Sequence, residues 1–217
     1  DASAYRIMPE AVAIPKTEED IVKIIRFASE NNISITPRTA GTSLAGQTIG
    51  NGIIVDVSKH FTKIVAFDAE KKTITVQPGV IRDELNLYLK PHGLFFSPTT
   101  STTNRCMIGG MVGNNSSGTT SIRYGVTRDK IVELKTVLSD GSLAVFKDLT
   151  SAEFIEKTKG DSLESKIYQT IYKELSNKEN QEEIKREFPK PEIHRRNTGY
   201  AIDALLKSEL FSGTEDT

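Results

Sequence analysis

The first 58 residues most constrain the fold, because strand and helix patterns alternate along them. Residues 11–14 predict a short strand. Thr17, with Asp20 at the reciprocal position, predicts a capping box at the start of a helix whose apolar residues share one face. Residues 33–36 predict a second strand. The continuous apolar run at 53–55 is typical of a strand that is covered on both faces. This order predicts a βαβ-like lobe.

After residue 58 the pattern changes to antiparallel pairs. Residues 64–67 and 73–76 flank a polar turn, which is typical of a hairpin. Residues 131–138 and 143–146 flank the turn residues Asp140-Gly141 in the same way. We therefore expect strand pairing between chain neighbours in this part of the molecule.

Helices complete the predicted fold. A short helix is expected from Ile81 to Leu89, stopped by Pro91 and Gly93, and helices dominate after residue 160. One of the later helices is expected to bury Ile167, Ile171 and Leu175. We predict an α+β fold and a single two-lobed domain over residues 1–217. Its small α/β lobe covers about 1–58, and a lobe with a mainly antiparallel sheet flanked by helices covers about 59–217.

Composition argues against several classes of protein. The 28 basic and 29 acidic side chains nearly cancel, which argues against a nucleic-acid binder held by bulk charge. The single cysteine, Cys106, excludes an intrachain disulfide and a multi-cysteine metal site, and the histidines show no metal-ligand spacing. No apolar run approaches the roughly 18 residues of a membrane span. Because the chain begins with Asp1 rather than Met, we expect a piece of a longer protein. The single cysteine, with no membrane-length apolar run and no signal segment at the start of the chain, leads us to expect a cytoplasmic location.

Acidic residues are missing from two glycine-rich segments. There is no Asp or Glu from Asn31 to Val55, and none in the 44 residues from Leu85 to Arg128, where the overall composition would place about six. Backbone N–H groups, hydroxyls and a few fixed cations hold an anion such as pyrophosphate, which a nearby carboxylate would repel. The segments therefore indicate anion-binding loops. Turn-rich surface loops would have the same composition.

Familiar motifs of other enzyme classes do not fit. The chain has no P-loop, residues 109–113 do not match the dinucleotide-binding fingerprint, and residues 41–46 miss the nucleophile elbow by one position. Cys106 lies beside the glycine cluster, but a small buried apolar residue is the favoured interpretation over a catalytic or covalent role. His92 is interpreted as part of a helix stop rather than as a base.

Five segments carry, in order, the motifs PRTAGTSL (37–44), CMIGGMVGNNSSG (106–118), RYG (123–125), VLSDG (137–141) and NTGY (197–200). Together they resemble the FAD-linked oxidases of the vanillyl-alcohol-oxidase/p-cresol-methylhydroxylase (PCMH) type. The first two are similar to the two flavin-nucleotide loops of that family. The most similar branch contains D-lactate dehydrogenase, the glycolate oxidase subunit and D-2-hydroxyglutarate dehydrogenase.

The resemblance implies a PCMH-type FAD-binding domain, with extended FAD between two lobes. Backbone N–H groups of the first loop would wrap the pyrophosphate, and the second loop would follow the flavin and its ribityl chain. Thr42 stands where some relatives carry a histidine bonded to the flavin, so non-covalent FAD is expected. The implied cofactor-binding residues are Pro37, Arg38, Thr39, Ala40, Gly41, Thr42, Ser43 and Leu44; Pro98, Thr99 and Ser101; and Ile108, Gly109, Gly110, Asn115 and Gly118.

Two features of the family are not found. Its Gly-Ser-Glu-Gly-Thr-Leu motif should follow residues 197–200, but residues 212–217 do not match it. The substrate domain, which carries the catalytic acid/base in relatives, is also missing. We therefore expect a domain that is incomplete at its C-terminus, with weakened FAD affinity, no catalytic residue and no bound metal.

The implied activity belongs to the parent protein. It is the oxidation of a D-2-hydroxy acid (D-lactate, glycolate or D-2-hydroxyglutarate) by hydride transfer to FAD, and the chain alone is expected to be inactive. Two alternatives stay open: an NADPH-dependent flavin reductase of the same fold, and a nucleotide- or phosphate-binding module without redox chemistry. The expected partners are FAD and the hydroxy acid; peripheral attachment of the parent to the inner membrane face is an alternative to a purely cytoplasmic location.

Overall fold

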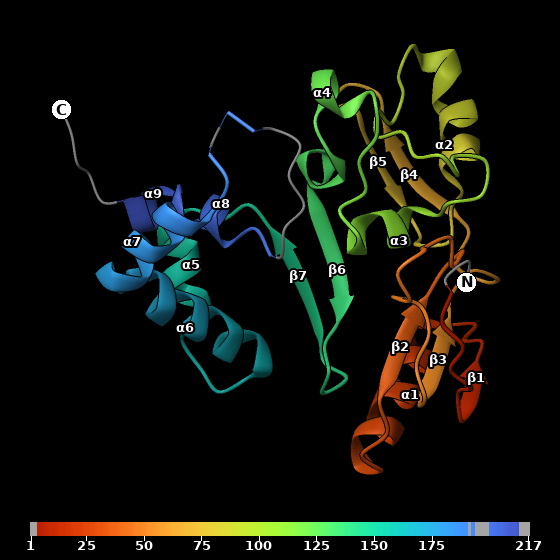
Figure 1. Cartoon of the computed structure of the whole chain (residues 1–217), viewed down its shortest axis with the longest axis horizontal. Coiled ribbons are helices and arrows are strands. Elements are labelled where there is room, and N and C mark those ends of the chain that lie inside the picture. The colour runs from red at the N-terminus through yellow and green to blue at the C-terminus, as the bar shows by residue number, and fades with distance from the viewer. Residues whose placement is uncertain (1–3, 191, 194–199, 213–217) are drawn as a thin grey trace. The chain divides into compact units, whose positions relative to one another are not determined.

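The computed structural model describes residues 4–190, 192–193 and 200–212 (Figure 1). The chain divides into two compact units. The first comprises Asp1–Ile131 together with Ser139–Gly141, and the second comprises Val132–Leu138 together with Ser142–Thr217. Each unit has its own apolar core. Every residue of the implied cofactor site lies in the first unit.

A three-stranded parallel sheet opens the first unit. Its strands are β1 (Ala11–Ala13), β2 (Ile35–Arg38) and β3 (Ile53–Asp56), in the order β1-β3-β2. The central place of β3 explains its sequence, since a strand with neighbours on both sides and covered faces is apolar throughout. All three apolar residues of β3 are buried. The predicted βαβ-like start is confirmed, with β3 inserted between the two strands that the helix connects.

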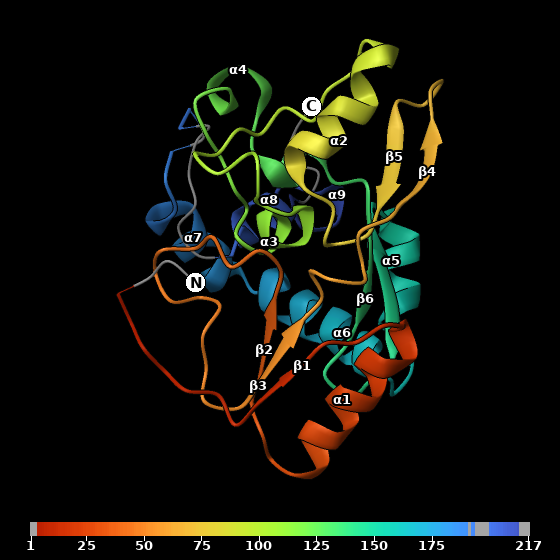
Figure 2. The ribbon, with the colours of Figure 1, turned by 90° about the vertical axis from the view of Figure 1, so that its right-hand side faces the viewer.

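Helix α1 (Glu18–Glu30) connects β1 to β2 and packs on the sheet (Figure 2). It begins with the predicted capping box: the Asp20 amide donates to the Thr17 hydroxyl at 3.2 Å, and the Thr17 amide donates to the Asp20 carboxylate at 3.0 Å. Ile24 and Ala28 belong to the core formed with the sheet. Asn31 caps the C-terminal end of the helix and is followed by Asn32, which has φ of 54°.

The rest of the first unit builds a second core from a hairpin and helices (Figure 2). The predicted hairpin, β4 (Ile64–Asp68) with β5 (Thr73–Val76), and the predicted helix α2 (Arg82–Leu89) are confirmed. Short helices follow: η1 (Lys90–His92), α3 (Ile108–Gly113), α4 (Ser121–Tyr124) and η2 (Thr127–Lys130). Cys106 is buried in this core, as the apolar interpretation predicts, and His92 ends η1 just before Gly93.

The second unit consists of a hairpin and a group of helices. Strands β6 (Glu133–Val137) and β7 (Leu143–Lys147) pair antiparallel, as predicted, so the antiparallel strands form two separate ribbons. The core of the helices includes Leu175, and the half-buried Ile171 packs against it, as predicted. Ile167 is half-buried, and its neighbour Tyr168 is buried. The helices are α5 (Ser151–Lys157), α6 (Leu163–Ser176), α7 (Lys178–Glu187), α8 (Ile202–Leu206) and α9 (Glu209–Ser212).

Among the described residues, no helix combines the length and the apolar character that crossing a membrane requires.

Candidate functional site

The first carboxylate-free segment leaves the parallel sheet at the end of β2. Pro37 and Arg38, expected in the loop, are the last residues of that strand and pair with Val55 and Asp56 of β3. The loop therefore begins at Thr39. This position is at the carboxyl edge of a parallel sheet, where α/β folds bind their ligands.

Arg38 lies against the backbone of this loop. Gly41 has φ of +65°, and a Cβ atom on it would lie 2.6 Å from Nη2 of Arg38. Glycine is thus favoured both by the left-handed backbone and by the close approach of the guanidinium. The guanidinium therefore places a positive charge beside the main chain of the loop.

The remainder of the loop is closed by its own contacts. The Ser43 hydroxyl donates to the side-chain oxygen of Gln47, and the Ile49 amide donates to the Gly46 carbonyl at 3.3 Å. Residues 39–43 are half-buried, whereas the Leu44 side chain is 72% exposed. The loop therefore keeps most of its backbone close to the protein while one apolar side chain projects outward.

The second carboxylate-free segment contains helix α3, where the sequence predicts only a loop. Its first amides are held by the preceding chain: Ile108 N donates to Val80 O at 2.9 Å, and Gly109 N donates to Pro78 O at 2.8 Å. A Cβ atom on Gly109 would collide with Pro78. Tertiary hydrogen bonds and close packing thus form this glycine-rich helix, despite its low intrinsic propensity.

Thr39 and Gly110 bring the two segments together. A Cβ atom on Gly110 would lie 2.6 Å from Oγ1 of Thr39. Gly110 is nevertheless exposed to solvent, so the contact lies at the surface of the first unit. A glycine here leaves backbone of α3 accessible beside the first loop, which is the arrangement expected of a site for an extended anionic ligand.

The loop that follows α3 is fixed by η2. Asn115, with φ of 44°, accepts a hydrogen bond from the Arg128 amide through Oδ1 at 3.0 Å. The carbonyl of Ser116 accepts from both the amide and the hydroxyl of the fully buried Thr127, at 3.1 and 2.6 Å. This loop then delivers Gly118 against the carbonyl of Thr99, so close that a Cβ atom on Gly118 would overlap its oxygen.

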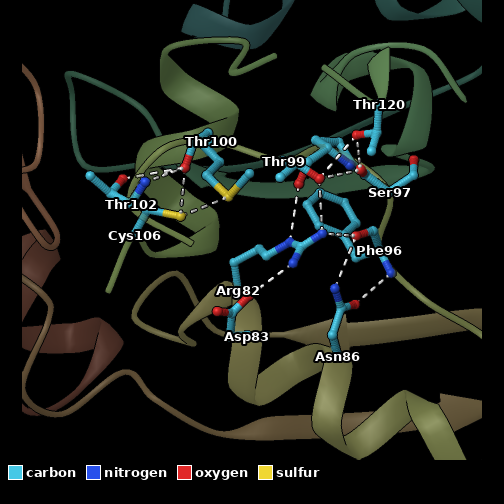
Figure 3. A network of polar contacts seen from close by, with 12 residues as sticks. Arg82, Asp83, Asn86, Phe96, Ser97, Thr99, Thr100, Thr102, Cys106 and Thr120 are labelled. Atoms are coloured by element: carbon cyan, nitrogen blue, oxygen red, sulfur yellow. Dashed lines mark hydrogen bonds and ion pairs between the residues drawn. The ribbon is translucent and has the colours of Figure 1, made fainter. Parts of the chain in front are cut away.

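Arg82 and Asn86 organise the hydroxyl-rich segment around Thr99, and sequence reasoning missed both (Figure 3). The Arg82 side chain is 13% exposed and donates to the carbonyls of Phe96 and Pro98, at 3.2 and 3.1 Å, and to the Thr99 hydroxyl at 3.3 Å. Asn86, one turn later on α2, bonds both the amide and the carbonyl of Phe96. The sequence did offer one signal for them: their i, i+4 spacing places both side chains on the same face of the predicted helix.

The structure thus joins three groups of implied residues, through Thr39 with Gly110 and through Thr99 with Gly118. The side chains of two implied residues lie inside the protein and not at a surface that could line a ligand. Pro98 is fully buried, and Ile108 is 7% exposed within the core, so both shape the segment from inside the protein. Ser101 is exposed. Residues 197–199 of the NTGY motif, His194 and residues 213–217 lie outside the described residues.

Comparison with known proteins places these features in a family. Residues 9–147 match the family described as FAD binding domain. The D-2-hydroxyglutarate dehydrogenase of Haemophilus influenzae is 39% identical over 217 residues, covering 96% of this chain and 20% of that protein. The glycolate oxidase subunit GlcD of Bacillus subtilis is 39% identical over 140 residues, covering 64% of this chain and 30% of that protein.

Solved structures agree on the fold. The xylooligosaccharide oxidase of Myceliophthora thermophila, in complex with xylobiose, superposes with a TM-score of 0.58 at 28% identity, covering 65% of this chain and 30% of the other. An alkyldihydroxyacetonephosphate synthase, at 23% identity and a TM-score of 0.55, shares the fold and covers 63% of this chain and 26% of its own. The chain spans about a fifth of the length of the D-2-hydroxyglutarate dehydrogenases that it matches.

Proposed function

The chain belongs to the FAD-binding domain family, and we propose that it forms the FAD-binding part of a dehydrogenase acting on a D-2-hydroxy acid. The proposed substrate class rests on how much of this chain each group of relatives aligns with. Four bacterial D-2-hydroxyglutarate dehydrogenases, at 35–39% identity, align with 96–97% of the chain. The glycolate oxidase subunit and three D-lactate dehydrogenases align with 63–64%. We therefore favour D-2-hydroxyglutarate as the substrate of the whole protein.

The described residues fit a bound FAD. Arg38 and Thr39, with the first-loop amides, would hold the pyrophosphate, since two segments without carboxylates meet there and a Cβ atom on Gly110 would fill the space beside Thr39. The loop from Asn115 to Gly118 would lie along the flavin and ribityl part of FAD. When bound, FAD supplies the two-electron acceptor of the oxidation. We place the catalytic acid/base outside this chain.

We propose that the FAD is held without a covalent bond. Thr42 occupies the position of the histidine that some relatives use, and residues 37–51 contain no histidine. The one cysteine is 4% exposed and packs in the core with Met111, so its thiol is not offered to a ligand. Acid precipitation of the FAD-loaded chain should leave all the flavin in the supernatant. A yellow pellet after washing would contradict this proposal.

The test of cofactor binding is a calorimetric titration of the chain with FAD. Gly110→Asp places a carboxylate beside Thr39, so it should weaken binding by tenfold or more through steric overlap and repulsion of the anion. Ala69→Asp is the matched control, because it adds the same charge at an exposed turn between β4 and β5. Its affinity should equal that of the wild type. Absence of saturable FAD binding by the wild type would overturn the proposed function.

A binding comparison and a dye-reduction assay separate the alternative functions. A nucleotide module without redox chemistry should bind ADP as tightly as FAD, whereas a flavin site should prefer FAD. For the whole protein, dye reduction with D-2-hydroxyglutarate but not with NADPH is expected, and the reverse would favour a flavin reductase. The chain alone should reduce no dye with any of these substrates.

A further inference from the structure

Phe95, Arg123 and Tyr124 form an exposed stack on the first unit, which we call the aromatic patch. The rings of Phe95 and Tyr124 meet edge to face, with their centroids 5.3 Å apart. Cζ of Arg123 lies 5.3 Å from the centroid of the Tyr124 ring. Phe95 is 54% exposed and Tyr124 is 37% exposed, and neither belongs to the implied cofactor residues. Single exposed apolar side chains are ordinary, whereas contiguous ones mark interaction sites.

The backbone holds Phe95 on the outside of its segment. Both neighbours, Leu94 and Phe96, are half-buried and pack against the core of the first unit. Asn86 fixes Phe96, since it donates to the Phe96 carbonyl at 3.2 Å and accepts from the Phe96 amide at 2.7 Å (Figure 3). Side chains that alternate in this way point to opposite sides of the chain, so the outward position of Phe95 follows from the burial of its neighbours.

Tyr124 is held by contacts that reach the same segment. Its amide donates to the Thr120 carbonyl at 3.0 Å, and the Thr120 hydroxyl donates to the Ser97 carbonyl at 2.6 Å (Figure 3). Hydrogen bonds therefore join the main chain that carries Tyr124 to the main chain that carries Phe95. Side chains that are fixed before binding lose little conformational freedom when a partner covers them, and tyrosine and arginine often dominate the energy of an interface.

The charge of the region favours an acidic partner. Residues 85–128 contain no carboxylate, and the exposed Arg123 lies on the ring of Tyr124, so its charge is held at the patch. The next acidic residue along the chain, Asp129, lies 3.8 Å from Nε of Arg128 and is already paired. An acidic and apolar surface would therefore be attracted to the patch. Two copies of the patch would bring one Arg123 against the other, which argues against self-association here.

We propose that the aromatic patch is the docking surface for the rest of the parent protein, which covers it with an acidic and apolar face. The D-2-hydroxyglutarate dehydrogenases that align with 96–97% of this chain match it over only 20% of their own length. Most of such a protein therefore lies outside the chain and has to meet it at some surface. This inference rests on the proposed function, because it takes the remainder of the dehydrogenase as the occupant.

The test is hydroxyl-radical footprinting, which measures the solvent accessibility of single aromatic side chains, applied to this chain and to the whole protein. Labelling of Phe95 and Tyr124 should fall by about fivefold or more in the whole protein, since side chains at the centre of an interface lose contact with water. Tyr88 is the internal control. It is 43% exposed on α2 and lies outside the patch, so its labelling should be equal in the two proteins.

Arg123→Glu tests the charge of the occupant. Arg123 is exposed and lies outside the implied cofactor residues, so the chain with this variant should keep its melting temperature and its FAD affinity. In the whole protein the reversed charge would repel an acidic face, and labelling of Phe95 should rise by about threefold over the wild type. Lys63→Glu is the matched control, because it makes the same change of charge at an exposed position just before β4. It should leave the labelling of Phe95 unchanged.

Three results would overturn the inference. Equal labelling of Phe95 in the chain and in the whole protein would show that the patch stays open to solvent, while the proposed function would stand. Protection of Phe95 that grows with the concentration of the chain alone would identify a second copy as the occupant. Unchanged labelling on Arg123→Glu in the whole protein would exclude an acidic occupant. Failure of the wild type to bind FAD, which calorimetry measures separately, would overturn the proposed function without altering the labelling of the patch.

Discussion

The Cα atom of Gly118 lies so close to the carbonyl oxygen of Thr99 that no side chain fits between them. The contact joins the end of the second flavin loop to the hydroxyl-rich segment. Neither side can easily move. The Thr99 hydroxyl accepts one hydrogen bond from Arg82 and lies 3.0 Å from the Thr120 hydroxyl, and the Gly118 amide donates to the Ser121 hydroxyl at 3.1 Å. Packing of backbone on backbone therefore fixes the relative positions of two parts of the candidate site.

Gly118→Ala should consequently be strongly destabilising. Because the new methyl group would overlap a fixed carbonyl oxygen, we expect a loss of about 3 kcal/mol or more in the free energy of unfolding, measured by urea denaturation. Gly113→Ala is the control, since a Cβ atom there would meet nothing within 4 Å. That variant should be neutral or slightly stabilising. Equal stability of the two variants would show that the contact is loose.

Arg82 should be intolerant of replacement, even by lysine. Arg82→Met removes the donor to the carbonyl of the buried Pro98 and one donor each to the Phe96 carbonyl and the Thr99 hydroxyl, so we expect a loss of about 3 kcal/mol in the free energy of unfolding. Arg82→Lys keeps the charge but not the planar fork that reaches several acceptors, so it should recover only part of the loss. Both variants should bind FAD more weakly than the wild type does in calorimetry.

Arg186→Met is the matched control for these variants. Arg186 forms ion pairs with Glu183 and Glu187, but its side chain is 67% exposed. Exposed ion pairs contribute little, so a change of less than about 0.5 kcal/mol is expected. If Arg82→Met were equally mild, the hydrogen bonds of Arg82 would not hold the segment that carries Ser97 and Thr99.

Local patterns were sufficient to predict most regular elements. The capping box at Thr17, the apolar run of β3 and the polar turn between β4 and β5 each act within a few residues, and the structure confirms all three. The order of the parallel sheet could not be read in this way, because the place of β3 between β1 and β2 depends on contacts between distant segments.

The elements missed by sequence reasoning depend on tertiary contacts. Helix α3 contains three glycines and forms because Val80 and Pro78 accept its first amide hydrogens, which no local propensity could indicate. Arg82 resembles any charged residue in the first turn of a helix until the Phe96–Thr99 segment is placed beside it. The buried side chains of α6 include Tyr168 rather than Ile167, and the Tyr168 ring lies against Phe154 of α5 and Phe146 of β7, which hydrophobic spacing alone does not indicate.

Cys106 should be unreactive in the folded chain. Its thiol is buried, accepts a hydrogen bond from the Thr100 hydroxyl at 3.4 Å and lies 3.6 Å from the sulfur of Met111. A reagent needs an accessible thiolate, so reaction with Ellman's reagent should be at least a hundredfold slower in buffer than in 8 M urea, an estimate of about 3 kcal/mol for local opening. Rapid modification of the native chain would show that this core is open and would revive a ligand-facing role for the cysteine.

Asp20 should make the stability of the first unit depend on pH. The amides of Lys16 and Thr17 donate to its carboxylate, at 2.9 and 3.0 Å, and hold the pKa of Asp20 below its usual value. Because the folded pKa is the lower one, the stabilisation is present above the unfolded value of about 4 and is lost as the pH falls through the folded pKa. Asp20→Asn should therefore show a smaller loss of urea midpoint between pH 7 and pH 3 than the wild type. Glu30→Gln, at the other end of α1, leaves the capping box intact and should keep the wild-type loss; an equal loss in all three proteins would exclude Asp20 as its source.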